Sequence, residues 1–417
     1  MSGREPRRAV VTGIGAVTPH GIGTEVFWKT TVGGGSSLAA LDRGGCEGYP
    51  LRVAGQVRGF DPAALVEETF LVQTDRFTHF AMAAARLALE DALLADADFD
   101  SPYSVGVVTA AGSGGGEFGQ RELQNLWGQG SKYVGPYQSI AWFYAASTGQ
   151  ISIRHGFKGP CGVVASDEAG GLDALAQAAR TVRHGTDTVV VGAAEAPLAP
   201  YSIVCQLGYP ELSRAPRPDR AYRPFTSEAC GFAPAEGGAV LVLEEERAAR
   251  ARGAEVRATV AGHGATFTGA SRWAESRDGL AHAIDIALGE AGCRPEDVDV
   301  VYADALGVPE ADRAEAGALA DALGPHARRV PVTAPKTGTG RAYCAAPVLD
   351  VTAAVLGLQH GLIPPTPHVT DPCHDLDLVT GSARAVEART ALVLSRGLMG
   401  CNAALVLRKG GVRGPHQ

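Results

Sequence analysis

The 417-residue sequence has no long apolar run and no cluster of basic residues. A helix that spans a bilayer needs about 18 apolar residues, so we expect no membrane partner. The charged segment 1–8 does not resemble a secretory signal, which favours a cytoplasmic location. A formal net charge of −8 likewise argues against binding to nucleic acid.

The eight cysteines form no Cys-x-x-Cys motif and follow no regular spacing. In a chain of this size, that pattern indicates reduced thiols rather than a disulfide framework. His368, Cys373, His374 and Asp375 could ligate a metal, but their spacing does not fit zinc. They stand among prolines, so we predict a surface loop and no metal site.

Gly13 and Gly15 lie in an apolar stretch over residues 8–17, as at the start of a dinucleotide-binding motif. The third glycine is missing at the required spacing, and Thr18-Pro19 stands where the helix should begin. We therefore predict no dinucleotide cofactor, and no other cofactor is indicated.

Apolar segments predict an α/β protein in which a pattern of strands and helices occurs twice. Residues 260–265 repeat the pattern of residues 11–16, and a helix at 280–291 followed by a strand at 298–303 repeats 87–94 and 105–110. Other expected elements are strands at 188–193, 237–244, 392–395 and 403–407, and helices at 61–68, 74–95 and 118–127. A charged helix at 245–252 marks the junction, so we predict two pseudo-repeated halves, 1–252 and 253–417.

The segment 159–174 combines a buried strand at 163–166, a turn of small residues and a helix that starts at Leu172. A turn between strand and helix places its central residue at a helix N-terminus, where free N–H groups favour negative charge. A nucleophile in such a turn is exposed and activated. The residue in this position is Glu168.

With Gly159-Pro160 before it and Gly171-Leu172-Asp173-Ala174 after it, this turn resembles the nucleophile loop of the β-ketoacyl synthase family, in the thiolase-like superfamily. That family has a cysteine where this chain has Glu168. A carboxylate cannot hold an acyl group as a thioester. The sequence therefore most resembles the chain-length factor of bacterial type II polyketide synthases over residues 8–408, which implies a five-layer α-β-α-β-α thiolase-like fold and an obligate dimer.

The resemblance extends to two loops that carry histidines in active ketosynthases. In the first, residues 301–307, Asp304 stands at the histidine position; in the second, residues 335–341, Arg341 does, while Lys336 is kept. The glycine-rich loop 397–402 also matches, with Met399 in place of a glycine. Condensation needs a thiolate and neutral imidazoles, so we expect no catalysis by this chain alone.

Buried acids need a cation, which predicts that Arg341 pairs with Glu168 and Asp304 in the vestigial site. Cys161 and Cys344 are expected to be small packing residues rather than replacement nucleophiles.

The resemblance implies a chain that pairs with a catalytic ketosynthase, works with an acyl carrier protein and sets polyketide length. In this family, bulky residues on the helix after the first glycine-rich run shorten the channel. Here that face has Gly116, Gly119 and Leu123, which predicts a long channel and a long product, with Tyr201 in the far wall. The two glycines could instead serve only a tight turn.

Two other functions would require residues that this sequence lacks. A malonyl-carrier-protein decarboxylase that generates a starter unit would still need the missing histidine pair. A homodimeric ketosynthase of fatty-acid type would need the missing cysteine.

Overall fold

The computed structural model describes residues 6–95, 97, 99, 101–269 and 276–411. Its main sheet consists of two sets of strands. The N-terminal set, in spatial order, is β1 (Ala9–Thr18), β8 (Gly237–Glu245), β7 (Thr188–Glu195), β5 (Val105–Ala110) and β6 (Cys161–Val164). The C-terminal set is β9 (Ala258–Phe267), β16 (Cys401–Lys409), β15 (Thr390–Arg396), β10 (Val300–Tyr302) and β11 (Pro331–Thr333), followed by β13 (Asp377–Leu378).

The first five strands of each set follow the same order and directions. Two antiparallel pairings lead from the first strand to the third, and two parallel pairings lead from there to the fifth. The sets meet where β1 and β9 pair antiparallel through Val10 with Thr259 and Val11 with Ala258. The duplicated halves expected from the repeated pattern are therefore present as two copies of one strand topology.

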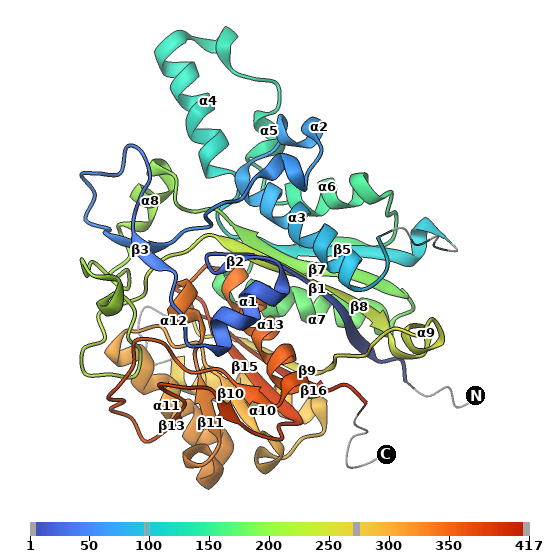
Figure 1. Ribbon diagram of the computed structural model, residues 1–417, viewed down its shortest axis with the longest axis vertical. Coiled ribbons are helices and arrows are strands. Elements are labelled where there is room, and N and C mark those ends of the chain that lie inside the picture. The colour runs from blue at the N-terminus through green and yellow to red at the C-terminus, as the bar shows by residue number, and fades with distance from the viewer. Residues whose placement is uncertain (1–5, 96, 98, 100, 270–275, 412–417) are drawn as a thin grey trace.

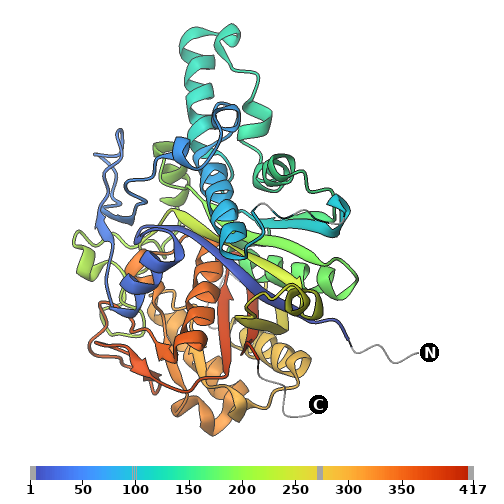
Figure 2. The same cartoon turned by 45° about the vertical axis from the view of Figure 1, so that its right-hand side comes forward.

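Helices complete the layers. In the centre, α7 (Gly170–Arg183) and α13 (Ala345–His360) contact strands of both sets and share one apolar core with them. On the outer faces, α3 (Arg76–Asp91) covers β1 and β8, and α10 (Ser276–Ala291) covers β9 and β16 (Figures 1 and 2). Two further outer helices are α6 (Ala146–His155) and α11 (Pro309–Leu323). This is the predicted thiolase-like arrangement.

The glycine pairs in the repeated pattern have a packing role. A Cβ at Gly13 or Gly15 would lie 2.3 Å from the carbonyl oxygen of Ala88 or 2.0 Å from that of Ala84, both in α3. Gly262 and Gly264 stand in the same relation to Ala287 and Ala283 of α10. Each Gly-x-Gly therefore lets a helix backbone approach its strand closely, which explains why the motif needs no third glycine.

Beyond the sheet, α4 (Gly116–Gln129) projects from the body together with α5 (Gln138–Ala141), as both views show (Figures 1 and 2). The predicted helix at 118–127 is confirmed in α4. The base of α4 contacts α8 (Pro200–Gln206). The remaining elements are α1 (Thr24–Val32), α2 (Glu68–Leu71), α9 (Glu246–Ala251), α12 (Lys336–Thr339), β2 (Gly21–Ile22), β3 (Leu38–Ala40), β4 (Val53–Gly55), β12 (Leu362–Ile363) and β14 (Arg384–Ala385).

Two local expectations were wrong. The predicted helix at 61–68 is only a 3-10 turn at Pro62–Ala64, with Asp61 accepting a hydrogen bond from Ala63 N, before α2 begins at Glu68. The strand predicted at 163–166 instead occupies Cys161–Val164, because residues 161–164 pair in register with β5 and the chain turns directly afterwards.

Candidate functional site

The turn between β6 and α7, here called the elbow, carries Glu168 at the nucleophile position, and this residue is not exposed. A 3-10 turn at Asp167–Ala169 leads into α7, and Asp167 has a positive φ of 53°. The Asp167 Oδ2 atom accepts a hydrogen bond of 2.5 Å from Met399 N, so the turn is fastened to the glycine-rich loop. Glu168 is only 2% exposed. Glu168 thus lacks the exposure that a nucleophile in such a turn would have, and its side chain points into the protein toward a cation, as expected for a buried acid.

That cation is Arg341. Its Nε donates to Glu168 Oε2 at 2.7 Å, and its Nη2 donates to Asp304 Oδ1 at 2.8 Å. Further hydrogen bonds reach the backbone oxygens of Asp304 and Arg396, at 3.1 and 2.6 Å. All the side chains involved in the ion pairs are nearly inaccessible to water. The predicted contact between Arg341 and both acids is present, and it joins the two halves of the fold.

A second arginine, which the sequence pattern did not indicate, joins these residues. Arg396, the last residue of β15, donates from Nε to Asp304 Oδ2 at 3.2 Å and from Nη2 to Glu315 Oε2 at 3.0 Å. Glu315 also accepts hydrogen bonds from the backbone N–H groups of Asp304 and Ala305. The only sequence signal was an arginine directly after an apolar strand. Glu168, Arg341, Asp304, Arg396 and Glu315 thus form one connected network, here called the buried charge network.

The acids of the buried charge network respond differently to burial. For Glu168, burial outweighs Arg341 and raises the pKa to about 7. For Asp304, burial opposes ionisation, but the adjacent Arg341 and Arg396 outweigh it and lower the pKa to about 2. Asp304 is therefore the fixed negative charge between two arginines, and Glu168 is a carboxyl that titrates near neutral pH.

Lys336 forms a separate buried pair. Its Nζ lies 2.5 Å from Asp350 Oδ2, with both side chains almost fully buried between α12 and α13. Burial raises the pKa of Asp350 to about 6. Lys336 thus helps to fix the loop that carries Arg341, and it does not reach a substrate space.

The two cysteines differ from each other. Cys344 is buried, as expected, and its thiol donates to the Asp167 carbonyl at 2.9 Å, while burial raises its pKa. Cys161 is exposed, because it begins the edge strand β6, so its assignment as a packing residue is wrong. Since a nucleophilic cysteine needs a lowered pKa, Cys344 is unsuited to replace the missing thiolate.

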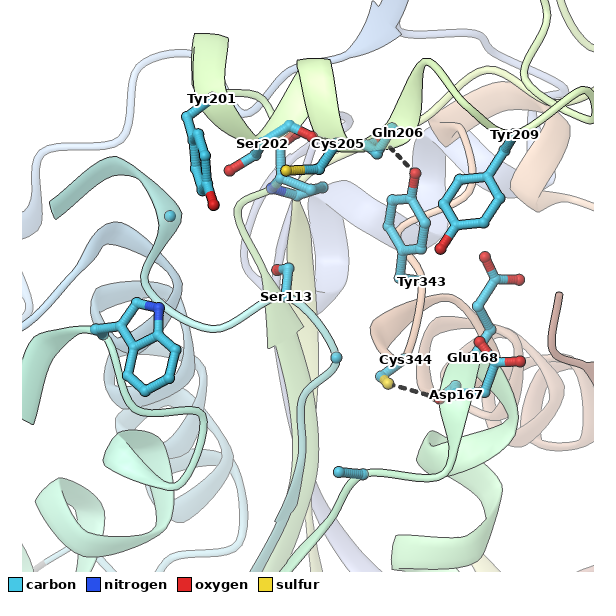
Figure 3. Close-up of a pocket in the computed structure, with 15 residues that line it drawn as sticks. Ser113, Asp167, Glu168, Tyr201, Ser202, Cys205, Gln206, Tyr209, Tyr343 and Cys344 are labelled. Atoms are coloured by element: carbon cyan, nitrogen blue, oxygen red, sulfur yellow. Dashed lines mark hydrogen bonds between the residues drawn. The ribbon is translucent and has the colours of Figure 1, made fainter. Parts of the chain in front are cut away.

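A recess of about 350 Å³ opens beside Glu168 (Figure 3). Among the predicted channel residues, Gly116 and Tyr201 line it. A Cβ at Gly119 would lie 3.3 Å from Trp142 Cδ1, whereas Leu123 is 40% exposed farther along α4. The described residues that line the recess are Gly112, Ser113, Gly116, Trp142, Ala165, Asp167, Glu168, Pro197, Tyr201, Ser202, Cys205, Gln206, Tyr209, Tyr343 and Cys344.

The suspected metal loop does not converge on a point. His368 Nε2 lies 2.8 Å from Ser36 Oγ, Asp375 pairs with Arg328, and His374 packs against Phe225. In the described part of the chain, no group of three or more His, Cys, Asp or Glu side chains is placed to hold a metal ion. Over the same residues, none of the helices has the length and apolar character required to cross a bilayer.

The buried charge network makes a prediction about stability. Replacing Arg341 with methionine leaves Glu168 and Asp304 without their shared cation, and we expect the free energy of unfolding to fall by about 3–5 kcal/mol. Arg277→Met is the matched control, because it breaks an exposed pair with Asp321. Denaturant titrations at one protein concentration should show little change for Arg277→Met. An equally small change for Arg341→Met would contradict the structural role of the network.

The raised pKa of Glu168 predicts a pH dependence. Between the ordinary value of 4.5 and about 7, the folded chain keeps a proton that the unfolded chain releases, so this group lowers stability as the pH rises. Glu168→Gln replaces the carboxyl with an amide that does not titrate, so this pH dependence is absent from the variant. The variant should gain stability relative to the wild type from pH 4.5 to just above 7, by roughly 3 kcal/mol at 1.36 kcal/mol per pKa unit. A difference between the two proteins that does not vary with pH would disprove the assignment.

Comparisons with known proteins agree with this geometry. The family description "Beta-ketoacyl synthase, N-terminal domain" matches residues 7–249, and "Beta-ketoacyl synthase, C-terminal domain" matches residues 257–370. The chain is 80% identical over 405 residues to "Putative polyketide beta-ketoacyl synthase 2" of Streptomyces halstedii, covering 97% of this chain and 98% of the relative. It is 50% identical to "Tetracenomycin polyketide synthase ketoacyl synthase beta subunit" of Streptomyces glaucescens, covering 97% and 99%.

Among solved structures, "The ishigamide ketosynthase/chain length factor" superposes with a TM-score of 0.87 at 28% identity, covering 98% of this chain and 100% of that chain. The resemblance inferred from the elbow and the two loops is thus confirmed. The chain belongs to the beta-ketoacyl synthase family, in its group of type II polyketide chain-length factors, or ketosynthase beta subunits.

Proposed function

We propose that this chain-length factor performs no condensation itself and sets the length of a long polyketide made by a catalytic ketosynthase partner. The observation that carries the proposal is the ion pair between Arg341 and Glu168 at the nucleophile position. A buried carboxyl held by an arginine offers no acyl acceptor. Asp304 and Arg341, at the two histidine positions, are bound to each other and supply no neutral imidazole.

Surface features support pairing with a second subunit. Large aromatic side chains are exposed on α4 and in the segment that follows it, a density typical of interaction surfaces rather than of free surface. They are Trp127, Tyr133, Tyr137, Trp142, Phe143 and Tyr144. In addition, β6 ends the strand order, and none of the described strands pairs with its outer edge. We propose that the ketosynthase covers this face in a cytoplasmic heterodimer that an acyl carrier protein serves.

The proposal of a long product depends on the base of α4. Gly116 and Tyr201 line the recess, so a larger residue at 116 would reduce its volume. The glycine also has a packing role, since a Cβ there would lie 2.1 Å from Ser202 Oγ in α8. Both uses of Gly116 are compatible, because close approach of α4 to α8 defines the wall of the recess.

The decarboxylase alternative fits the recess poorly. A malonyl group carries a carboxylate, and none of the described residues that line the recess is lysine, arginine or histidine. Asp167 and Glu168 face the same space, so the malonyl anion would meet acidic groups of its own sign. The chain-length function needs no such anion site in this subunit.

The proposed division of labour can be tested by reconstitution. The purified chain alone should not become acylated by an acyl carrier protein, whereas its mixture with the ketosynthase should make polyketide from malonyl groups. In the mixture, Glu168→Gln should still support polyketide synthesis at most of the wild-type rate, because Glu168 forms no covalent intermediate. Mass spectrometry of intact subunits and products provides the measurement. Acylation and extension by the chain alone would refute the proposal.

Product length can be tested on α4 without disturbing its contact with α8. Phenylalanine at position 119 meets mainly the ring of Trp142, which is exposed and can move. Because Trp142 lines the recess, its displacement would reduce the space for the growing chain. We therefore expect Gly119→Phe to shorten the product by one or more ketide units. Gly128→Phe on the same helix is the control, because a Cβ there has no neighbour within 4 Å. If both variants made the wild-type product in intact heterodimers, Gly119 would have no part in measuring length.

A further inference from the structure

The recess runs from α4 to the vestigial elbow. Figure 3 shows Tyr201 at one end and Tyr209, Tyr343 and Glu168 at the other, with Ser202 and Cys205 of α8 along the side between them. The space that begins beside α4 therefore ends at the position where an active ketosynthase has its nucleophile.

Hydrogen bonds hold the wall near Tyr343. The Tyr343 hydroxyl donates to Gln206 Oε1, and Gln206 Nε2 donates in turn to the carbonyls of Pro197 and Ser202, at 2.6 and 2.9 Å. Ser113 and the N–H of Gly112 are held by the buried carboxylate of Glu195. A recess whose walls are fixed by such bonds keeps its shape without a ligand.

The floor of the recess carries an unsatisfied polar atom. Arg341 binds Oε2 of Glu168, whereas Oε1 is buried and has no hydrogen-bond partner. A buried polar atom without a partner is energetically unfavourable, so a ligand group that pairs with it would be favoured. Glu168 lines the recess at the end where Tyr209 and Tyr343 lie, so a ligand group that reaches this end approaches the Glu168 carboxyl (Figure 3).

The chemistry of the lining selects the ligand. The charged groups among the described lining residues are both acids, which disfavours an anion. Tyr209 offers a hydroxyl at the same end, and the carboxyl of Glu168, with its pKa of about 7, is partly protonated near neutral pH and can then donate. These donors suit carbonyl oxygens. Apolar contacts along the recess come from Pro197, Trp142 and the tyrosine rings.

Resting on the proposed function, we propose that the recess receives the distal end of the growing chain of alternating ketone and methylene groups, and that Glu168 and Tyr209 stop it there by hydrogen bonding to its last carbonyls. A volume of about 350 Å³ lies at the lower end of the range for small-molecule sites, roughly 300–1,000 Å³. It fits a terminal segment rather than a whole product. The vestigial elbow would then serve as the end stop of the channel.

The test uses Cys205, which lines the recess from α8 and is exposed. In the complete system of heterodimer, carrier protein and malonyl groups, Cys205→Leu and Cys205→Phe should shorten the product progressively, whereas Cys205→Ala should preserve its length. The matched control is Val204→Phe, the neighbouring exposed position on α8, which does not line the recess. Product masses and size-exclusion profiles of the heterodimers are measured for every variant.

The outcomes separate the two proposals. If the wild-type heterodimer does not form or makes no polyketide, the proposed function fails. If intact Cys205→Phe heterodimers make products of wild-type length, or if Val204→Phe shortens the product equally, the recess is not the end stop although the proposed function stands. A second variant, Tyr209→Phe, keeps the volume and removes one donor, so it should broaden the distribution of lengths. An unchanged distribution would refute the role of hydrogen bonding at the floor.

Discussion

One guanidinium group holds this site together. Arg341 contributes hydrogen bonds to a carboxylate from the N-terminal half, to a carboxylate from the C-terminal half and to the backbone at the end of β15. Removing these charges from water costs several kcal/mol each, and close, well-directed pairs return that cost only when all partners are present. Arg341 therefore joins the three segments that surround the nucleophile position.

The charge balance of the network explains why its acids behave differently. Three carboxyls, from Glu168, Asp304 and Glu315, share two arginines. Asp304 touches both arginines and stays ionised, with its pKa lowered to about 2. Glu168 has one arginine and a buried free oxygen, and its pKa rises to about 7. Burial also raises the pKa of Glu315. A proton on either Glu168 or Glu315 would leave two ionised acids against two arginines.

The sequence predicted the parts that depend on local pattern. The duplicated halves could be read from two Gly-x-Gly strands and their helices. The Arg341 pairing needed the family resemblance, which placed Arg341 beside two acids at the catalytic positions, together with the need of buried acids for a cation. Arg396 was missed because it lies 55 residues beyond Arg341, and only the order of strands brings β15 beside β10. The exposure of Cys161 and the extension of the recess to Glu168 were missed for the same reason. Edge positions and cavities are set by topology, which periodicity does not reveal.

The charged residues at the cysteine and histidine positions and the open recess beside them are physically related. A ketosynthase fold needs an open space beside its elbow, and that space would tend to collapse if the surrounding loops were free to move. In this chain the ion pairs of Arg341, the bond from Met399 N to Asp167 and the Glu195 carboxylate hold the walls apart. Under the proposed function, the charged residues at the cysteine and histidine positions carry out no condensation, and their ion pairs hold the cavity walls in place. A subunit whose task is to bound a growing chain depends on that stiffness more than on a nucleophile.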